Sequence, residues 1–483
     1  MRYDLIVLGN NPIGLEGALA AVQLNKRVAV VVPREADIER SRVPSRAALR
    51  EAALMLTEFR HQGASSNRTA RRRKVTSGQL RQVSNEIESK KSANIDRRLR
   101  DYGVDFLAGS ARFVGPHEVE VTSATNESKR LMGDNILMAV GTQSARPSQI
   151  PFDGKTILDS DEVLSLDRVP KSMIVVGGGH VALECAMTFA LLGTRIAVVD
   201  DQRQLLEHCD REIVRAIRQQ AAQFGVRFRL GRSIRAIEKT VDNRAAVRLD
   251  GGKSLIAECV LYAAQQRGMT DSLNLFAAGL LADEHGRLWC NENGQTWVKH
   301  IYGAGDVVGF PAFAGQTLKQ GTLIVGHAFG QSVTGSQPIA RGLRTIPELA
   351  MVGATEQQLS HDLVAYEVGV ARFRDTSRGH LSVPENGMLK LLFHRESLEL
   401  LGVHCLGESA SELIRIGQTV MSLSGTIESF RDSSFEHSAL TECYWHAAND
   451  GLRRQEEESA TSEATLHLWR PKSRRRRLVP SLS

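Results

Sequence analysis

The sequence predicts an α/β protein built from two Rossmann-like units and a C-terminal α+β region. An apolar run at 3–8 leads into a glycine turn at 9–14, and the same order of strand, glycine turn and helix returns at 173–199. The third observation is that 350–450 mixes the strand patterns VAYEVGVARF and GMLKLLFH with later helices. A chain of 483 residues has room for about three domains of about 150 residues each.

The first unit opens with a strand at 3–8, because a short apolar run that ends in glycine is typical of a buried parallel strand. The helix LEGALAAVQLNK and the strand RVAVVV come after it. The turn before the helix reads GNNPIG, whereas a dinucleotide-binding turn reads Gly-x-Gly-x-x-Gly. Asn11 therefore stands where the middle glycine belongs.

The second unit, MIVVGGGHVALE, keeps the full spacing with Gly177, Gly179 and Ala182. Gly177 allows a tight turn, Gly179 lets a pyrophosphate approach the backbone, and a small residue at 182 lets helix and strand pack closely. The helix amino terminus would then face the phosphates with its partial positive charge. The alternative is a tight turn without a ligand.

Asp200 closes the next strand, TRIAVVD, about 20 residues after this turn, where a carboxylate binds a ribose 2′-hydroxyl. A carboxylate there favours NAD over NADP. Arg203, three residues later, is able to reach a 2′-phosphate, and its alternative role is that of a solvated loop arginine. We expect NAD(P) at this unit and leave the choice between the two nucleotides open.

Composition excludes several classes of protein. No run of about 18 apolar residues is present, so no membrane span is expected, and the N-terminus lacks the pattern of a signal peptide. Six cysteines lie singly along the chain without a CxxC or Cys/His cluster. We therefore expect no disulfide framework, no metal site and a reducing, cytoplasmic location.

The net charge of +6 is uneven, because basic residues gather at 57–98 and 452–483. The runs RTARRRK and RRRR are able to bind phosphates of nucleic acid or lipid, but few aromatic residues accompany them. Such runs are more often solvated, and we expect no nucleic-acid partner. Residues 57–98 are compatible with helix, most clearly in SGQLRQVSNEIESKKSANIDRRLRDYG, and the tail at 453–483 is predicted to be disordered.

A third glycine motif, IYGAGDVVG at 301–309, is typical of a strand that ends in a turn, with Asp306 at a helix start. With two glycine turns before it and a C-terminal module after it, the sequence resembles the two-dinucleotide-binding-domain flavoproteins, the class I pyridine nucleotide-disulfide oxidoreductases. The resemblance covers about residues 2–452. The stretches TIPELAMVGATEQQL, YEVGVARF and LLFHRESLELLGVHCLGESASELIRIGQ are most similar to its soluble pyridine nucleotide transhydrogenase branch.

This resemblance implies the domains and the cofactors. FAD would bind a discontinuous domain at 1–150 and 267–340, NAD(P) a domain at 151–266, and a domain at 341–452 would join two copies in a homodimer. In the family, the aspartate that matches Asp306 bonds the FAD ribityl chain. The residues that match FAD-binding positions are Gly9, Gly14, Ala111, Gly141, Gly305 and Asp306.

The FAD half departs from the family pattern at several positions. Asn11 puts a side chain near the pyrophosphate, Val32 replaces the carboxylate for the adenosine ribose, PREADIERSR replaces a glycine-rich loop, and Val140 stands where threonine is usual. A lost charged hydrogen bond costs about 1.5–3 kcal/mol. Since about 1.4 kcal/mol is a factor of ten in affinity, retention of FAD is left open.

The redox dithiol of the family's disulfide reductases is missing. Two cysteines four residues apart should precede the helix that matches RVPSRAALREAA, but 34–46 contains none. Thiolate chemistry needs a thiolate, so disulfide reduction by this route is excluded, whereas transhydrogenation needs no dithiol. Arg46 matches the family lysine near flavin N5, and Glu184 matches its carboxylate partner, with a structural ion pair as the alternative.

Near the C-terminus, EHSALTECYW places His437 and Glu442 at the spacing of the family's His-Glu dyad, which acts in the partner subunit's site. The histidine there is an acid/base toward a thiol, and the glutamate orients its ring. Ser438 and Ala439 replace the usual Pro-Thr. A working base and a remnant that lines the pocket are both compatible with this sequence.

The resemblance implies FAD-dependent hydride transfer between NADPH and NAD. The alternative is a non-catalytic, flavin-poor paralogue that binds NAD as a dimer, which the changes at Asn11 and Val32 favour. A third option is a flavin-dependent reductase with another acceptor, such as a quinone. The flavin content of the purified protein separates the first two.

Overall fold

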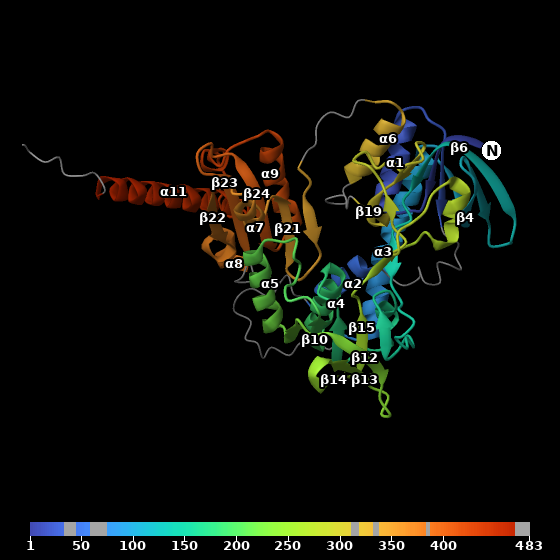
Figure 1. Ribbon diagram of the computed structural model, residues 1–483, viewed down its shortest axis with the longest axis horizontal. Helices are drawn as coiled ribbons and strands as arrows, with labels where there is room; N and C mark the ends of the chain where they lie inside the picture. Colours follow the sequence, from blue (N-terminus) through green and yellow to red (C-terminus); the bar gives the residue numbers. More distant parts are fainter. Residues whose placement is uncertain (33–44, 58–74, 311–317, 332–337, 383–386, 469–483) are drawn as a thin grey trace, which may run out of the picture.

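The structure is a computed structural model in which the chain forms three lobes (Figure 1). Among the residues that it describes, no helix combines the length and apolar character that a membrane span requires. The described residues are 1–32, 45–57, 75–310, 318–331, 338–382 and 387–468.

The first lobe is a seven-stranded sheet in the order β3-β2-β1-β6-β5-β4, with β18 also paired to β6. The strands β3, β2, β1, β6 and β18 run parallel, and β4 and β5 add an antiparallel edge. Their bounds are β1 (Arg2–Leu8), β2 (Val28–Val32), β3 (Asp105–Ala108), β4 (Ser110–Gly115), β5 (Glu118–Thr122), β6 (Ser128–Met138) and β18 (Ile301–Gly303). Since the register aligns Leu8 and Gly303 with Met138, the turns after β1 and β18 meet at one end of the sheet.

Two helices cover this sheet next to the first glycine turn: α1 (Pro12–Gln23) and α6 (Leu318–Ala328). They approach closely because both carry glycine where they cross. A Cβ on Gly321 would lie 2.2 Å from the carbonyl oxygen of Ile13, and one on Gly17 would lie 3.4 Å from the carbonyl oxygen of Gly321. The predicted first helix is therefore present, and it begins earlier than LEGALAAVQLNK because Asn11 caps it and Pro12 opens it.

The second lobe repeats the parallel plan with the strand order β11-β10-β9-β15-β8. Its strands are β8 (Ile157–Asp159), β9 (Ser172–Val176), β10 (Arg195–Asp200), β11 (Val226–Leu230) and β15 (Cys259–Tyr262), and its helices are α4 (His180–Leu191) and α5 (Arg211–Gln223). A separate antiparallel sheet joins β12 (Ile234–Lys239), β13 (Ala245–Leu249) and β14 (Ser254–Ala257). Both predicted Rossmann-like units are thus confirmed as strand, glycine turn, helix and strand.

The third lobe is an antiparallel sheet in the order β20-β21-β24-β23-β22 with helices around it. Its strands are β20 (Arg341–Leu343), β21 (Glu348–Gly353), β22 (Tyr366–Arg372), β23 (Met388–His394) and β24 (Leu400–Gly407). Its helices are α7 (Glu356–His361), α8 (Ser377–Ser382), α9 (Ala410–Ser422), α10 (Glu428–Arg431) and α11 (Glu442–Leu468). The predicted strands VAYEVGVARF and GMLKLLFH correspond to β22 and β23, so the α+β prediction is confirmed.

Short elements lie between these strands and helices. The two-stranded pairs are β7 (Thr142–Ser144) with β16 (Gln266–Gly268), and β17 (Leu288–Trp289) with β19 (Val308–Phe310). The 3₁₀ turns are η2 (Glu162–Ser165), η3 (Asp250–Gly252), η4 (Asp271–Leu273), η5 (Leu275–Ala278), η6 (Gly305–Val307) and η7 (Phe373–Asp375).

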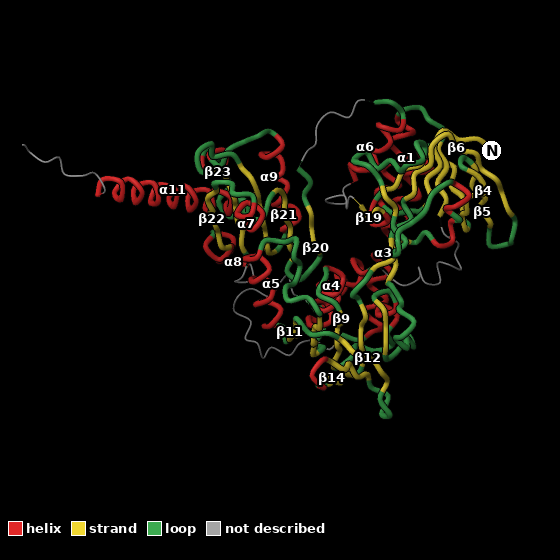
Figure 2. The backbone as a smooth tube through the Cα atoms, viewed as in Figure 1, coloured by secondary structure: helices red, strands yellow, loops and turns green. Residues whose placement is uncertain are grey.

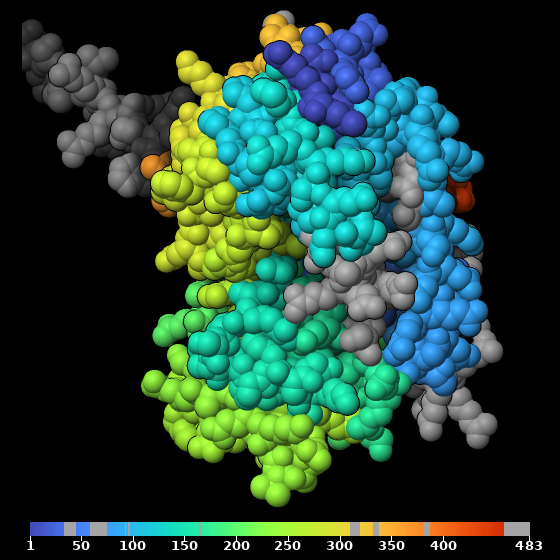
Figure 3. All heavy atoms as spheres, turned by 90° about the vertical axis from the view of Figure 1, so that its right-hand side faces the viewer, coloured from blue at the N-terminus to red at the C-terminus, as the bar shows by residue number. Residues whose placement is uncertain are grey.

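The helix α3 (Ser77–Asp101) confirms the helix expected in the clearest part of 57–98 and joins the first two lobes. Near its start, Leu80 belongs to the core of the second lobe, and near its end, Leu99 belongs to a core of the first lobe. Figure 3 shows this segment as a light-blue column down one side of the molecule. The helix α2 (Arg46–Leu56) packs beside it, with Leu49 in the same core as Leu80. Residues 58–74, which contain RTARRRK, lie outside the described residues.

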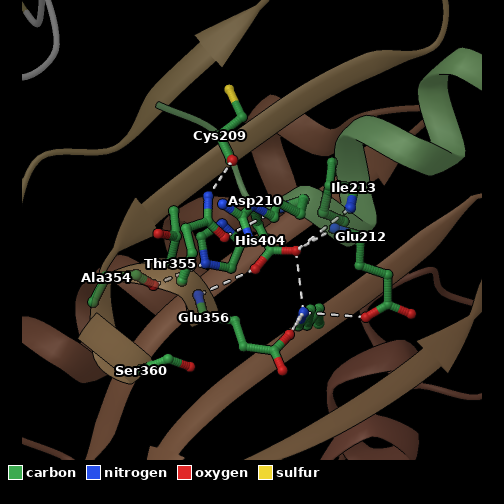
Figure 4. A network of polar contacts seen from close by, with 12 residues as sticks. Cys209, Asp210, Glu212, Ile213, Ala354, Thr355, Glu356, Ser360 and His404 are labelled. Atoms are coloured by element: carbon green, nitrogen blue, oxygen red, sulfur yellow. Dashed lines mark hydrogen bonds and ion pairs between the residues drawn. The ribbon is translucent and has the colours of Figure 1, made fainter. Parts of the chain in front are cut away.

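A buried cation joins the second and third lobes. The Nζ of Lys390, which is fully buried, lies 3.1 Å from a carboxylate oxygen of Asp210 and 3.1 Å from one of Glu212, and it also contacts Glu356. Figure 4 shows Asp210, Glu212 and Glu356 in this network, together with His404, which is buried. Burial opposes the charge on Asp210, but His404 and Lys390 outweigh it and hold the pKa of Asp210 below its ordinary value. Because the ammonium stands among the three carboxylates, it offsets part of their negative charge within the protein.

The prediction of a disordered tail is wrong for 453–468. This stretch continues α11, which projects from the third lobe as a single helix in Figure 2. The reason is electrostatic: Arg453 pairs with Asp450 at 3.0 Å and Glu457 at 2.7 Å, and Arg454 pairs with Asp450 at 2.8 Å. Pairs three and four residues apart stabilise a helix without apolar periodicity. Residues 469–483, including RRRR, lie outside the described residues.

Candidate active site

The first glycine turn keeps two glycines for packing reasons. Gly9 has a φ of +108°, and a Cβ there would lie 2.3 Å from the carbonyl oxygen of Ala139. A Cβ on Gly14 would lie 2.6 Å from the Cβ of Ala139. Helix α1 and strand β6 therefore approach so closely that neither glycine tolerates a side chain. These two predicted residues define the end of the sheet where the site lies.

The side chain of Asn11 occupies the space in front of α1. It is the N-cap residue, and its Oδ1 accepts a hydrogen bond of 2.8 Å from the backbone N–H of Gly14. The next residue, Pro12, has no N–H to offer. Two of the first three helical residues thus have no free N–H, which is the group that binds phosphate at a helix start.

The GAGD turn stands beside this cap. Gly305 has a φ of +76°, and a Cβ on it would lie 3.3 Å from Nδ2 of Asn11. Asp306 follows on η6 with an exposed side chain. The first and third glycine motifs, which are far apart in sequence, are therefore brought together as the parallel register of β1, β6 and β18 requires.

The remaining predicted FAD positions lie around the same sheet. Gly141 follows β6 with a φ of +73° and has no atom within 4 Å of a Cβ position. Ala111 is half-buried on β4, opposite Val121 of β5. Val32 ends β2 with 6% of its surface exposed, so an apolar side chain stands where the family carries a carboxylate. The loop PREADIERSR lies outside the described residues.

The second glycine turn has the same shape but an open front. Gly177 has a φ of +117°, and a Cβ on it would lie 2.8 Å from the carbonyl oxygen of Ala263. Gly179 is the N-cap residue of α4 and makes no side-chain cap, and no atom lies within 4 Å of its Cβ position. Ala182 is fully buried, as expected for close packing of helix on strand. The backbone at Gly179 is therefore accessible to a ligand phosphate.

Asp200 lies directly beside this turn. A Cβ on Gly178 would lie 2.6 Å from its Oδ2, and its Oδ1 accepts a hydrogen bond of 2.7 Å from the backbone N–H of Gln202. Burial raises the pKa of Asp200, and the neighbouring carboxylate of Asp201 adds to the rise. Arg203 is exposed in the loop after β10, so it is free to meet a phosphate. The structure thus brings the glycine turn and the predicted ribose carboxylate together.

The predicted pair of Arg46 and Glu184 is not formed. Arg46 instead pairs with Asp161, with 3.6 Å between Nη1 and Oδ1, whereas Glu184 accepts a hydrogen bond of 3.0 Å from the backbone N–H of Arg344. The electrostatic influence of Arg46, Glu184 and Asp161 on Cys185 shows that the three groups are neighbours. The longer, forked guanidinium reaches a different carboxylate, which the Lys-based family pattern does not reveal.

Two residues that the sequence motifs do not include, Ser377 and His446, belong to the site of the His437 dyad. Glu442 does not contact His437 directly: its Oε1 accepts from His446 at 3.3 Å, and Ser377 lies between the two predicted residues. His446 could have been found from its spacing of one helical turn after Glu442. Nothing in the sequence marks Ser377, because only the tertiary fold brings the start of α8 to α11.

The described residues fit NAD(P) well and fit FAD with one obstacle. Beside Asp161, the Nε of Arg46 is buried and has no hydrogen-bond partner among the described residues, as expected for a donor that is available to a ligand. The obstacle is the cap on Gly14. To bind the N–H of Gly14, FAD has to displace the N-cap hydrogen bond of Asn11, which costs about 1 kcal/mol. This cost lowers the affinity for FAD about fivefold and does not exclude binding.

Comparison with known proteins agrees with this geometry. Residues 3–328 match the family model of the pyridine nucleotide-disulphide oxidoreductases, and residues 339–448 match the dimerisation domain of that family. The soluble pyridine nucleotide transhydrogenase of Mycobacterium bovis (strain BCG / Pasteur 1173P2) is 38% identical over 462 residues, covering 94% of this chain and 98% of that protein. The soluble pyridine nucleotide transhydrogenase of Photobacterium profundum is 34% identical with the same coverage.

Solved structures share the fold. The crystal structure of LpdA from Mycobacterium tuberculosis has a TM-score of 0.82 at 22% identity and covers 93% of this chain and 99% of that one. The HOCl-induced flavoprotein disulfide reductase RclA from Escherichia coli has a TM-score of 0.77 at 21% identity and covers 92% and 99%. The chain therefore belongs to the pyridine nucleotide-disulphide oxidoreductase family, and within it to the soluble pyridine nucleotide transhydrogenases.

Proposed function

We propose that this chain transfers hydride between NADPH and NAD, with FAD as the carrier. The observation that carries the proposal is that one chain holds two dinucleotide turns and a GAGD turn but has no cysteine between the first turn and Arg46. When bound, FAD supplies a ring that accepts a hydride from one nicotinamide and returns it to another. The thiol steps of the family's dithiol enzymes are therefore absent from this reaction.

No other cysteine replaces the missing dithiol. All six cysteines are free and buried. Burial raises the pKa of Cys185, which lies near Arg46, to about 12. A thiol with such a pKa is protonated at neutral pH and does not act as a nucleophile.

Residues of the second lobe would hold the nicotinamide nucleotides. The uncapped start of α4 at Gly179 presents backbone N–H groups to the pyrophosphate, and Asp200 accepts a hydrogen bond from a ribose hydroxyl. Arg203 is the residue that would accommodate a 2′-phosphate when NADPH is the donor. One site would thus take NAD and NADPH in turn, with Asp200 and Arg203 serving the two forms.

Residues of the first lobe would hold FAD. Gly9 and Gly14 shape the turn, Gly305 and Asp306 stand beside it, and Arg46 offers a buried Nε. Arg46 would orient the flavin and tune its electron affinity by its positive charge. Gly141 and Ala111 complete the expected contacts from β6 and β4.

His437 and Glu442 would line the partner subunit's site in a homodimer built by the C-terminal domain. In a hydride reaction without a thiol, the two residues would line the pocket and exclude water from it. We place the enzyme in the cytoplasm, where six unpaired cysteines remain reduced.

The proposal is tested by following reduction of thio-NAD by NADPH with FAD-saturated full-length protein. We expect turnover that requires both nucleotides and FAD, and no NADPH oxidation with glutathione disulfide or lipoamide. Protein that cannot be loaded with FAD but binds NAD would indicate the non-catalytic paralogue instead. Consumption of NADPH with a quinone and without NAD would indicate a reductase of another acceptor.

A further inference from the structure

Ser377 lies between the two residues of the C-terminal dyad. It opens α8 directly after η7, and its Oγ is 3.0 Å from Nδ1 of His437 and 3.3 Å from Oε1 of Glu442. Its backbone N–H donates a second hydrogen bond of 3.1 Å to Oε2 of Glu442. The dyad is therefore a chain of three residues in which the serine joins histidine to glutamate.

The donors and acceptors of this chain can be assigned from Glu442. Burial alone would raise its pKa, but the backbone N–H of Ser377 and the side chains of His446 and Ser377 outweigh burial and hold the pKa below its ordinary value. An ionised carboxylate has only acceptor oxygens. His446 Nε2 and the Ser377 hydroxyl, each 3.3 Å from Oε1, must therefore both donate.

A serine hydroxyl has one hydrogen to give. Since Ser377 gives it to Glu442, its oxygen must accept from His437, and Nδ1 of His437 must carry a hydrogen. In the neutral ring, Nε2 is then unprotonated and is the nitrogen that can take up a proton. A direct contact with Glu442 would give the same tautomer but would add a full negative charge next to the ring, whereas the serine transmits only a polarised hydroxyl.

The local backbone differs from the expected pattern at the same place. Ser438, directly after His437, has a φ of +82°, which lies in the left-handed region that favours glycine. Such a conformation costs about 1–3 kcal/mol and persists only where surrounding contacts hold it. The hydrogen bond from His437 to Ser377 is such a contact, and it spans 60 residues of sequence.

We propose that Ser377 is a positioning residue that fixes His437 as the Nδ1–H tautomer and leaves Nε2 as its proton acceptor. The inference concerns a residue used by the proposed function, but it is tested by the protonation state of His437 and not by turnover. The two can therefore fail separately: a protein without transhydrogenase activity can still show the tautomer, and an active protein can lack it.

The test is magic-angle-spinning NMR of full-length protein with ¹⁵N-labelled histidine at a pH where the ring is neutral. The His437 signal is identified by its loss in His437→Gln. We expect wild-type His437 as the Nδ1–H form. Ser377→Ala keeps the backbone N–H but removes the hydroxyl, and it should lower the ratio of Nδ1–H to Nε2–H by about fivefold, as for loss of one hydrogen bond.

Two variants complete the test. Ser377→Thr keeps a hydroxyl and should restore the wild-type ratio. Ser433→Ala removes the hydroxyl of another serine in the same region, which bonds to Ser429 and not to Glu442, and should change nothing. A wild-type Nε2–H tautomer, an unchanged ratio in Ser377→Ala, or an equal loss in Ser377→Ala and Ser433→Ala would overturn the proposal. If Ser377→Ala does not fold, the wild-type tautomer and the threonine variant still decide the question.

Discussion

The two glycine turns differ at one equivalent position, the N-cap of the helix that follows. Their first glycines, Gly9 and Gly177, have φ values of +108° and +117°. Each lies against the backbone carbonyl of the residue that follows a neighbouring strand, Ala139 after β6 and Ala263 after β15. At the N-cap, however, Asn11 bonds its own helix, whereas Gly179 leaves the helix start open. The comparison shows that glycine needed by the fold and glycine needed by the ligand occupy separate positions, and that only the second kind has been lost from the first turn.

The size of this loss decides what the first turn can still do. An N-cap hydrogen bond contributes about 1 kcal/mol, so displacing Asn11 weakens FAD binding by about fivefold. Val32 removes a further contact with the adenosine ribose. We therefore expect the affinity for FAD to be reduced but still measurable.

The largest effect is expected where glycine serves the fold. Gly177→Val introduces a β-branched residue at a φ of +117° and a Cβ 2.8 Å from the oxygen of Ala263. The free energy of unfolding should fall by about 3 kcal/mol, measured by chemical denaturation. The matched control is Gly179→Ser, at an ordinary φ and with open space, which should leave stability unchanged or slightly higher. Equal losses in both variants would break the distinction between the two kinds of glycine.

The next effect transfers the cap of the first turn to the second. Gly179→Asn should bond the start of α4 as Asn11 bonds α1, and it should weaken NAD binding at least about tenfold, measured by calorimetry. The melting temperature should not fall, because asparagine is a good N-cap residue. Unchanged NAD affinity would mean that the open front of this turn does not serve the pyrophosphate.

The reverse exchange should have a smaller effect of opposite sign. Asn11→Gly frees the N–H of Gly14 and also removes the side chain in front of it, so FAD should bind more tightly, by up to about fivefold. Quenching of flavin fluorescence measures the affinity. Flavin-free protein should lose a few tenths of a kcal/mol of stability, about the cost of glycine at an N-cap. If FAD binds no better or worse in this variant, then Asn11 does not compete with the cofactor.

The smallest effect concerns Asp200, whose pKa is raised by burial and by Asp201. A raised carboxyl pKa means that ionisation of Asp200 lowers the free energy of unfolding. This loss of stability begins as the pH rises above the ordinary carboxyl pKa of about 3.9. Asp200→Asn should therefore raise the melting temperature slightly at pH 7 and have no such benefit at pH 3. A benefit that grows as the pH falls would contradict the assigned direction. NAD binding should weaken in the same variant, because the charged acceptor of the ribose hydroxyl is lost.

Features held by local sequence were predictable. The strands before Gly9 and Gly177, the helices after them and the acid at Asp200 follow from apolar runs and glycine spacing within a few residues. The meeting of the first turn with Asp306 was implied by the family resemblance, and the structure shows that the parallel pairing of β1 and β18 with β6 produces it.

Features held by tertiary contacts were not predictable. Asp161 pairs with Arg46, and Ser377 joins His437 to Glu442, because separate elements meet in space and no motif marks either residue. The helix at 453–468 was missed for another reason: ion pairs around Asp450 stabilise it, and its sequence lacks the apolar period used to recognise helices.

The central claim is that hydride passes from NADPH to FAD and from FAD to NAD within this chain. The most direct measurement is an anaerobic titration of FAD-loaded protein with NADPH, followed by NAD, with the visible absorbance of the flavin as the signal. The account predicts that NADPH bleaches the flavin and that NAD restores its colour. A flavin that stays oxidised in excess NADPH, or one that NADPH bleaches and NAD cannot restore, would contradict it.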